Sequence, residues 1–124
     1  MAKILIIEDE RVLNEAYQTI LQQHKHEVFS AFDGEEAIKI TKDLEPDVIL
    51  LDLRMPKMNG IEFLKVYDQP NKHPKVKIVI FSNLDMQKEI DEAYKYGAGR
   101  YMLKAWASPK ELVKLIADTL NEKS

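Results

Sequence analysis

The chain has 124 residues, the usual size of a single domain, and its 45% hydrophobic and 31% charged content is that of a globular protein. A net charge of −3 without any Lys/Arg run argues against direct nucleic-acid binding, and the absence of cysteine excludes disulfides, thiolate nucleophiles and thiolate zinc sites. The apolar run at Ile4–Ile7 is too short for a signal peptide or a membrane span, so we expect a cytoplasmic protein with no membrane partner.

Two continuous apolar runs predict the central strands of a sheet. Ile4–Ile7 and Val48–Leu51 each end in acidic residues, as strands buried on both faces do. The segment between them has apolar residues at helical spacing, which predicts a helix with one inward side. The members of that side are Leu13, Ala16, Tyr17, Ile20 and Leu21.

Shorter elements follow on either side of the second run. Val28–Ala31 is a candidate strand, and a second helix with Ala37, Ile38 and Thr41 facing inward follows it. After Asp52, the proline and the Asn-Gly pair of Met55–Gly60 predict a loop. A third helix begins with Ile61, Leu64 and Val66.

The C-terminal half continues the alternation of strands and helices. We expect a surface loop bracketed by Pro70 and Pro74, strands at Val76–Phe81 and Arg100–Leu103, and a fourth helix between these strands. That helix carries an apolar stripe of Met86, Ile90, Ala93 and Tyr94, and a fifth helix starts with Ser108 as N-cap, Pro109 at its first position and Glu111 completing a capping box. The pattern predicts an α/β fold of (βα)5 type, an open doubly wound parallel sheet with helices on both faces.

Polar side chains lie where four of these strands end. They are Glu8 and Asp9, Asp52, Ser82 and Lys104. Ligands of doubly wound sheets bind at the carboxyl ends of the strands, and three carboxylates in one place need a cation to stay ionised. Mg²⁺ fits best, since together with the Lys104 ammonium it balances the three negative charges. One carboxylate could then attack a phosphoryl group whose oxygens contact Lys104 and Ser82.

With these residues the chain resembles a response-regulator receiver domain of two-component signalling, over essentially its whole length. Glu8-Asp9 matches the acidic pair of the family, Asp52 with the Met55–Gly60 loop matches the phosphoacceptor segment, and Ser82 matches the switch hydroxyl. Tyr101 and Lys104 match the switch aromatic residue and the family's lysine.

The resemblance implies a fold, a cofactor and a mechanism. The fold is the flavodoxin-like, CheY-like one with strand order 2-1-3-4-5. Mg²⁺, for which Mn²⁺ could substitute, would be bound by Glu8, Asp9, Asp52 and the backbone carbonyl of Arg54. The chain would act as a signalling switch rather than an enzyme, with self-catalysed phosphotransfer to Asp52 and autodephosphorylation as its only chemistry.

The resemblance also implies partners. A sensor histidine kinase or a histidine phosphotransfer protein would supply the phosphoryl group. Ser82 would move inward and Tyr101 would rotate, so that the face formed by the fourth helix, the fifth strand and the fifth helix binds a downstream protein. We expect residues 1–124 to be one stand-alone receiver domain without an output domain, a monomer or a weak dimer promoted by phosphorylation.

Several residues depart from the family pattern. Lys104 precedes Ala105 instead of proline, so we expect a trans peptide bond there. Trp106 is expected to fold back on the last helix or the neighbouring loop, the alternative being an exposed anchor for a partner. Asn83 stands where relatives commonly have Ala or Gly, and Arg54 and Leu84 stand at positions that tune dephosphorylation, which predicts an altered lifetime of the phosphoryl group.

Other functions fit the sequence less well. A degenerate receiver that binds proteins without phosphorylation would not need every pocket residue, and a phosphatase of the haloacid dehalogenase type needs an acid where Arg54 stands. A nucleotide or flavin binder lacks its glycine-rich motif. The three histidines His24, His26 and His73 are expected on the surface.

Overall fold

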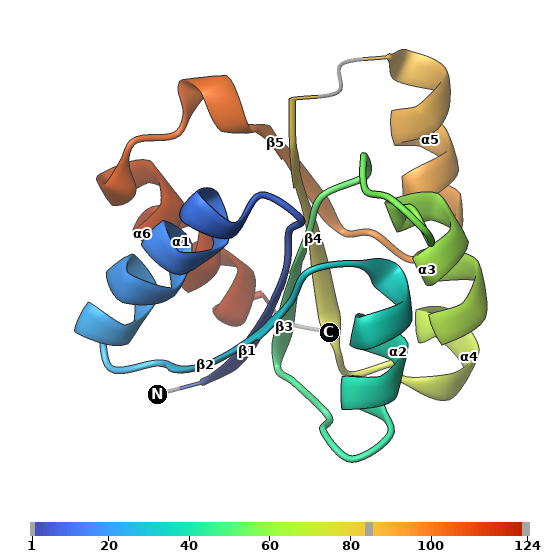
Figure 1. Ribbon diagram of the computed structural model, residues 1–124, viewed down its shortest axis with the longest axis horizontal. Helices are drawn as coiled ribbons and strands as arrows, with labels where there is room; N and C mark the ends of the chain where they lie inside the picture. The colour runs from blue at the N-terminus through green and yellow to red at the C-terminus, as the bar shows by residue number, and fades with distance from the viewer. Residues whose placement is uncertain (1, 84–85, 123–124) are drawn as a thin grey trace.

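A five-stranded parallel sheet forms the centre of the molecule, which the computed structural model describes for residues 2–83 and 86–122. The strands are β1 (Lys3–Ile7), β2 (Glu27–Ala31), β3 (Val48–Leu51), β4 (Lys77–Ser82) and β5 (Arg100–Leu103). They lie in the order β2-β1-β3-β4-β5, and every neighbouring pair is parallel (Figure 1). The predicted doubly wound sheet and its strand order are confirmed.

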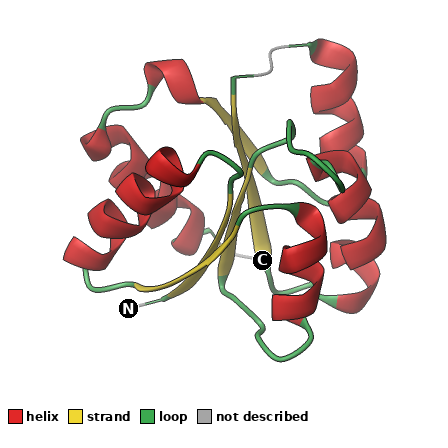
Figure 2. Ribbon diagram, viewed as in Figure 1, coloured by secondary structure: helices red, strands yellow, loops and turns green. Residues whose placement is uncertain are grey.

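Helices cover both faces of this sheet (Figure 2). On one face lie α1 (Arg11–Gln23) and α6 (Pro109–Leu120), and on the other α2 (Gly34–Thr41), α3 (Gly60–Tyr67) and α5 (Gln87–Lys95). A 3-10 turn, η1 (Lys104–Trp106), joins β5 to α6. The fourth and fifth helices of the predicted series are therefore α5 and α6.

The loop expected between Pro70 and Pro74 is only partly a loop. Gln69–Lys72 forms the short helix α4, and Pro70 is the second residue of its first turn. A proline is tolerated there because the first N–H groups of a helix have no partner within the helix. Proline was therefore a misleading signal for a loop at this place.

The core has two layers because the side chains of each strand alternate between the faces of the sheet. Leu5, Ile49 and Ile78 lie in the layer beneath α2, α3 and α5, together with Phe63 of α3. The layer beneath α1 and α6 includes Ile4, Val48, Val79, Leu21, Leu112 and Ile116. Both faces of the central strands are covered, which explains their continuous apolar sequences.

Three residues assigned to inward helix faces lie largely on the surface. Val66 is 50% exposed, because α3 turns Phe63, Leu64 and Tyr67 towards the sheet instead. Met86 is 53% exposed as the residue before the first turn of α5, and Tyr94 is 44% exposed. A fourth residue, Ala16 of α1, is also exposed.

The starts of α3 and α6 are capped by side chains. Ser108 caps α6 as predicted, with its hydroxyl accepting a hydrogen bond from Glu111 N at 3.2 Å. A capping box with both reciprocal bonds lies at Asn59 and Glu62, at the start of α3. The loop that follows Asp52 therefore ends in a firmly defined helix start.

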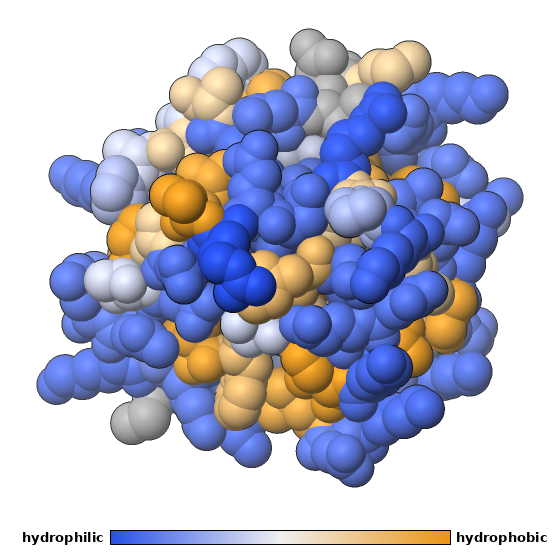
Figure 3. Space-filling model, in the orientation of Figure 1, coloured by the Kyte–Doolittle hydropathy of each residue, from blue (hydrophilic) through white to orange (hydrophobic). Residues whose placement is uncertain are grey.

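Hydrophilic residues cover most of the face shown in Figure 3. The apolar residues visible there gather mainly in the lower middle, where the edge strand β2 runs between the two helical layers. In the described residues, no helix has the length and apolar character needed to cross a membrane.

Candidate functional site

The polar residues at the strand ends meet at one edge of the sheet. Glu8 directly follows β1, Asp52 directly follows β3, and Lys104 directly follows β5. Ser82 is the last residue of β4. Parallel strands bring all their carboxyl ends to the same edge, so the residues predicted for the site lie together there.

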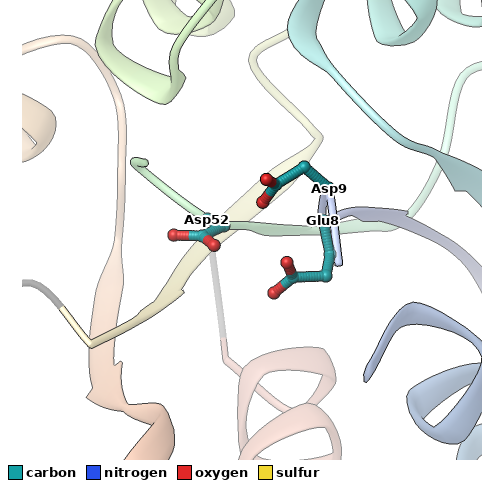
Figure 4. Close-up of side chains that lie close together, drawn as sticks. All are labelled: Glu8, Asp9 and Asp52. Atoms are coloured by element: carbon teal, nitrogen blue, oxygen red, sulfur yellow. The ribbon is translucent and has the colours of Figure 1, made fainter. Parts of the chain in front are cut away.

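Three carboxylates form a cluster at this edge (Figure 4). Glu8, Asp9 and Asp52 each offer an oxygen, and these oxygens lie within 4.8 Å of one another. Glu8 and Asp52 are buried, whereas Asp9 is partly exposed. Among the described residues this is the one group of three or more acidic, histidine or cysteine side chains so arranged. An all-oxygen donor set of this kind suits a hard divalent cation such as Mg²⁺.

Lys104 supplies a positive charge to the cluster. Its Nζ lies 2.8 Å from Asp52 Oδ2 and also contacts Glu8 Oε1. Burial of the ammonium disfavours its charge, but hydrogen bonds to Asp52 and Glu8 outweigh this effect, so the pKa of Lys104 is raised. The lysine is therefore fully charged at neutral pH and bridges two of the three carboxylates.

Burial makes the Glu8 carboxylate hard to keep ionised. Desolvation raises the pKa of its carboxyl to about 7, although hydrogen bonds from Lys104 and from the Glu10 backbone oppose the shift. Its Oε2 accepts the Glu10 N–H at 2.9 Å, while Oε1 faces Lys104. Both oxygens of Glu8 therefore have partners within the protein.

Asp52 is held by hydrogen bonds on both of its carboxylate oxygens. Oδ1 accepts from the Ser82 hydroxyl at 2.8 Å and from Arg54 N at 3.1 Å, and Oδ2 accepts from Lys104. Its backbone N–H donates to Ile7 O at 3.0 Å, which ties the end of β3 to the end of β1. This carboxylate is thus fixed in orientation at the centre of the site.

The Arg54 side chain points away from Asp52 towards α5. Its guanidinium lies 3.5 Å from Glu89, and the side chain is 64% exposed. The role of the Arg54 carbonyl as a metal ligand stays a prediction. Leu84, which was expected to affect dephosphorylation, lies outside the described residues.

A cavity of about 330 Å³ opens above these groups. It is large enough for a phosphoryl group together with hydrated metal. The lining residues are Asp9, Glu10, Asp52, Arg54, Ser82, Asn83 and Lys104. Asn83 therefore does border the site, as its sequence position suggested.

The turn that carries Lys104 follows one expectation and contradicts another. The Lys104–Ala105 peptide bond is trans, as predicted from the absence of proline. Trp106 is 78% exposed, so the expectation that it folds back on the last helix is wrong. The three-residue turn η1, which begins at Lys104, leaves the indole exposed to solvent.

Tyr101 lies on β5 and is not among the residues that line the cavity above the carboxylates. It is partly buried against the core and lines a separate cavity of about 300 Å³ with residues of α5 and α6, including Tyr94. This cavity occupies the face on which we expect a downstream partner. The switching role of Tyr101 stays a prediction.

One site residue was missed from the sequence. Asn14 is fully buried in α1, and its amide donates to Glu8 O at 2.9 Å and to Ala31 O at 3.1 Å. These bonds hold the backbone that carries the acidic pair. A polar residue within the apolar side of a predicted helix was the signal available in the sequence.

The histidines lie apart from the site. His24 is exposed, and His26 accepts a hydrogen bond from Ala2 N at 3.3 Å. His73 is partly buried, stacked on Tyr67 and 2.7 Å from Glu45, so it is more enclosed than a surface histidine.

The comparisons with known proteins agree on one family. The family described as "Response regulator receiver domain" matches residues 4–117. The transcriptional regulatory protein LnrK of Bacillus subtilis is 35% identical over 106 residues, which is 84% of this chain and 47% of LnrK. The chain thus spans about half the length of the first curated relatives that it matches.

Proteins of similar length also match. The chemotaxis protein CheY of Thermotoga maritima is 30% identical over 115 residues, covering 92% of this chain and 93% of that protein. The solved structure of the chemotaxis protein CheY4 of Vibrio cholerae superposes with a TM-score of 0.88 at 28% identity, covering 96% of this chain and 98% of that one.

Proposed function

The chain belongs to the response regulator receiver domain family, and from this premise we propose that it accepts a phosphoryl group on Asp52 as a two-component signalling switch. The observation that carries the proposal is the setting of Asp52, which hydrogen-bonds Ser82 and Lys104 beside the acidic pair Glu8-Asp9. These are the groups that phosphoryl transfer to a carboxylate needs: a positioned nucleophile and charges that neutralise the phosphoryl oxygens.

The transfer proceeds by attack of an Asp52 carboxylate oxygen on the phosphorus of a phosphohistidine. A P–O bond forms, the P–N bond of the donor breaks, and the departing imidazole nitrogen keeps the electron pair and takes up a proton from solvent. Lys104 and Ser82, which contact Asp52 before the reaction, then contact the oxygens of the phosphoryl group. Water later hydrolyses the acyl phosphate, which restores the Asp52 carboxylate and releases inorganic phosphate.

Mg²⁺ is the cofactor that fits the donor set, and Mn²⁺ could substitute for it. When bound, the ion neutralises charge on the phosphoryl oxygens. Glu8, Asp9 and Asp52 would hold it, together with the backbone carbonyl of Arg54. Asn14 contributes by holding the backbone of Glu8 in place.

The partners follow from the chemistry of the family. A sensor histidine kinase or a histidine phosphotransfer protein supplies the phosphoryl group, and a downstream protein binds the face of α5, β5 and α6, where Tyr94 and Tyr101 line a cavity. We propose no direct nucleic-acid contact by this domain. It acts as a monomer or as a weak dimer promoted by phosphorylation.

A small-molecule phosphoryl donor tests the proposal without the unknown kinase. Acetyl phosphate or phosphoramidate with Mg²⁺ should add one phosphoryl group in an acid-stable, alkali-labile linkage, seen as a mass increase that EDTA prevents. The Asp52→Asn variant should remain unmodified while keeping its fold. A chain that is not modified, or an Asp52→Asn variant modified as fast as the wild type, would reject Asp52 as the acceptor and favour a receiver that acts through protein contact alone.

A further inference from the structure

A side-chain hydrogen bond joins the segment after β4 to the turn after β5. Asn83 Oδ1 accepts the backbone N–H of Ala105 at 3.0 Å. The last register pair of the two strands is Ser82 with Leu103, so Asn83 lies opposite Lys104, just where the ladder ends. The Asn83 amide therefore extends the pairing of β4 and β5 by one bond beyond the backbone ladder.

This bond acts on the peptide unit that follows Lys104. The N–H of Ala105 and the C=O of Lys104 belong to one rigid plane. The N–H is bound by Asn83, and the C=O accepts from Ala107 N at 3.1 Å. Because both ends of the plane are hydrogen-bonded, the backbone at Lys104 has little freedom to rotate.

The direction of the lysine side chain depends on that backbone. The Lys104 ammonium reaches Asp52 and Glu8 at the end of a long flexible stem, and its side chain is only 9% exposed. A flexible lysine side chain holds its ammonium in one place only if the Cα of the lysine is fixed. The Asn83 bond restrains this Cα from the residue that follows β4, next to Ser82, which hydrogen-bonds the other oxygen of Asp52.

We propose that Asn83 is a positioning residue for Lys104, acting through the Ala105 N–H. The inference rests on the proposed function, since it concerns the lysine that meets the phosphoryl group. The proposal also connects two residues that differ from the family pattern, Asn83 and Ala105. A proline at position 105 would have no N–H to donate, so the acceptor at Asn83 is useful only because Ala105 follows the lysine.

Two substitutions separate this role from simple narrowing of the cavity. Asn83→Ala removes both the bulk and the amide that supplies the acceptor, whereas Asn83→Leu keeps the bulk and removes the amide. If the hydrogen bond matters, both variants change in the same direction; if bulk matters, only Asn83→Ala differs from the wild type. Asn71→Ala is the matched control, because the exposed Asn71 amide donates to Asp68 Oδ1 at the start of α4 and does not line the cavity at the strand ends.

The first measurement is amide hydrogen exchange of Ala105 by NMR, without metal or phosphoryl donor. We expect exchange about 2- to 10-fold faster in both Asn83 variants, the range of one exposed hydrogen bond, and no change in Asn71→Ala. Unchanged exchange in the Asn83 variants would overturn the proposal, because it would show that Asn83 does not hold the Ala105 N–H. The result of this measurement does not depend on whether the chain accepts a phosphoryl group.

The second measurement compares two affinities. Beryllofluoride, a mimic of the phosphoryl group that needs Lys104, should bind about 2- to 10-fold more weakly to both Asn83 variants. The affinity for Mg²⁺ alone should not fall, since the carboxylates hold the metal. A parallel loss of both affinities would indicate a general structural role, and wild-type beryllofluoride affinity would overturn the proposal. If the wild type itself binds neither beryllofluoride nor a phosphoryl group, the proposed function fails instead.

Discussion

The Lys104 ammonium lies 2.8 Å from Asp52 Oδ2 and at the same time contacts Glu8. One cation thus bridges two carboxylates of the acidic cluster, and the third, Asp9, is the most exposed of the three. The site limits its excess negative charge by this ammonium and by the readiness of Glu8 to take up a proton. A divalent cation would therefore bind where the negative charge is already partly balanced.

Removing the bridging cation should destabilise the metal-free protein. In Lys104→Met, two buried carboxylates lose their partner, and we expect the free energy of unfolding in EDTA to fall by about 3 kcal/mol. Mg²⁺ should restore part of this loss because it replaces the missing positive charge. Urea unfolding with and without Mg²⁺ measures both effects.

A lysine on the surface provides the control. Lys114 pairs with Asp118 at 3.1 Å, but its side chain is 71% exposed, so Lys114→Met should change stability by less than about 1 kcal/mol. Equal stability of Lys104→Met and the wild type in EDTA would show that the contacts of Lys104 with Asp52 and Glu8 contribute nothing to the free energy of unfolding.

The raised pKa of Glu8 predicts a pH dependence of stability. Its carboxyl has a pKa of about 7 in the folded protein against 4.5 as the ordinary value. Between these values the folded state holds a proton that the unfolded state has lost, so stability falls as the pH rises from 4.5 to 7 and this contribution is constant outside that window. The decrease in EDTA should reach about 3 kcal/mol at most.

Glu8→Gln isolates this contribution, because glutamine resembles the protonated acid at every pH. The difference in unfolding free energy between the variant and the wild type should grow from pH 5 to pH 7.5. In the wild type, Mg²⁺ binding should strengthen over the same range, since the ionised carboxylate is the form that favours a cation. A difference that does not change with pH would contradict the assignment to Glu8.

Occupation of the site should change the face that carries Tyr101. Ser82 donates to Asp52 Oδ1 in the absence of a phosphoryl group, and a phosphoryl oxygen would compete for this hydroxyl. Beryllofluoride should therefore shift the NMR signals of Ser82, Tyr94 and Tyr101. In Ser82→Ala the mimic should still bind, but the shifts at the two tyrosines should be much smaller. Shifts confined to the strand ends in the wild type would reject the switch.

Trp106 provides a spectroscopic reporter and a candidate contact for the phosphoryl donor. With 78% of the residue exposed, its fluorescence should be red-shifted and readily quenched by acrylamide. Trp106→Ala should change the free energy of unfolding by no more than about 0.5 kcal/mol and leave phosphorylation by phosphoramidate unaffected. Transfer from a protein donor should become slower. A blue-shifted, protected indole would show that the residue is packed rather than available to a partner.

The sequence predicted the sheet and the convergence of the strand-end residues for one physical reason. Strands buried on both faces appear as continuous apolar runs, and parallel strands bring the residues after those runs to one edge, so Glu8, Asp52 and Lys104 could be placed together without coordinates. The position of Trp106 could not be predicted, because it depends on the path of a three-residue turn.

Short helices were predicted less accurately than strands. In α3, a small rotation decides whether Phe63 or Val66 faces the sheet, and the eight-residue helix has too few turns for its period to settle this. Asn14 shows a different limit. Its burial is explained by two backbone carbonyls from distant strand ends, which only the fold brings within reach.

The loop after Asp52 should be intolerant of any side chain at Gly60. A Cβ there would lie 2.7 Å from both Asp52 O and Leu53 Cα, which are backbone atoms that cannot move without displacing the chain at the end of β3. Gly60→Ala should therefore lower the free energy of unfolding by about 2 kcal/mol and slow phosphorylation by phosphoramidate.

Gly99→Ala is the matched control, because its Cβ would meet only Ile78 O at 3.8 Å. That variant should be as stable as the wild type or more stable by up to about 1 kcal/mol. Equal stability and equal phosphorylation rates for the two variants would show that the close approach of Gly60 to Asp52 is not needed to hold the site.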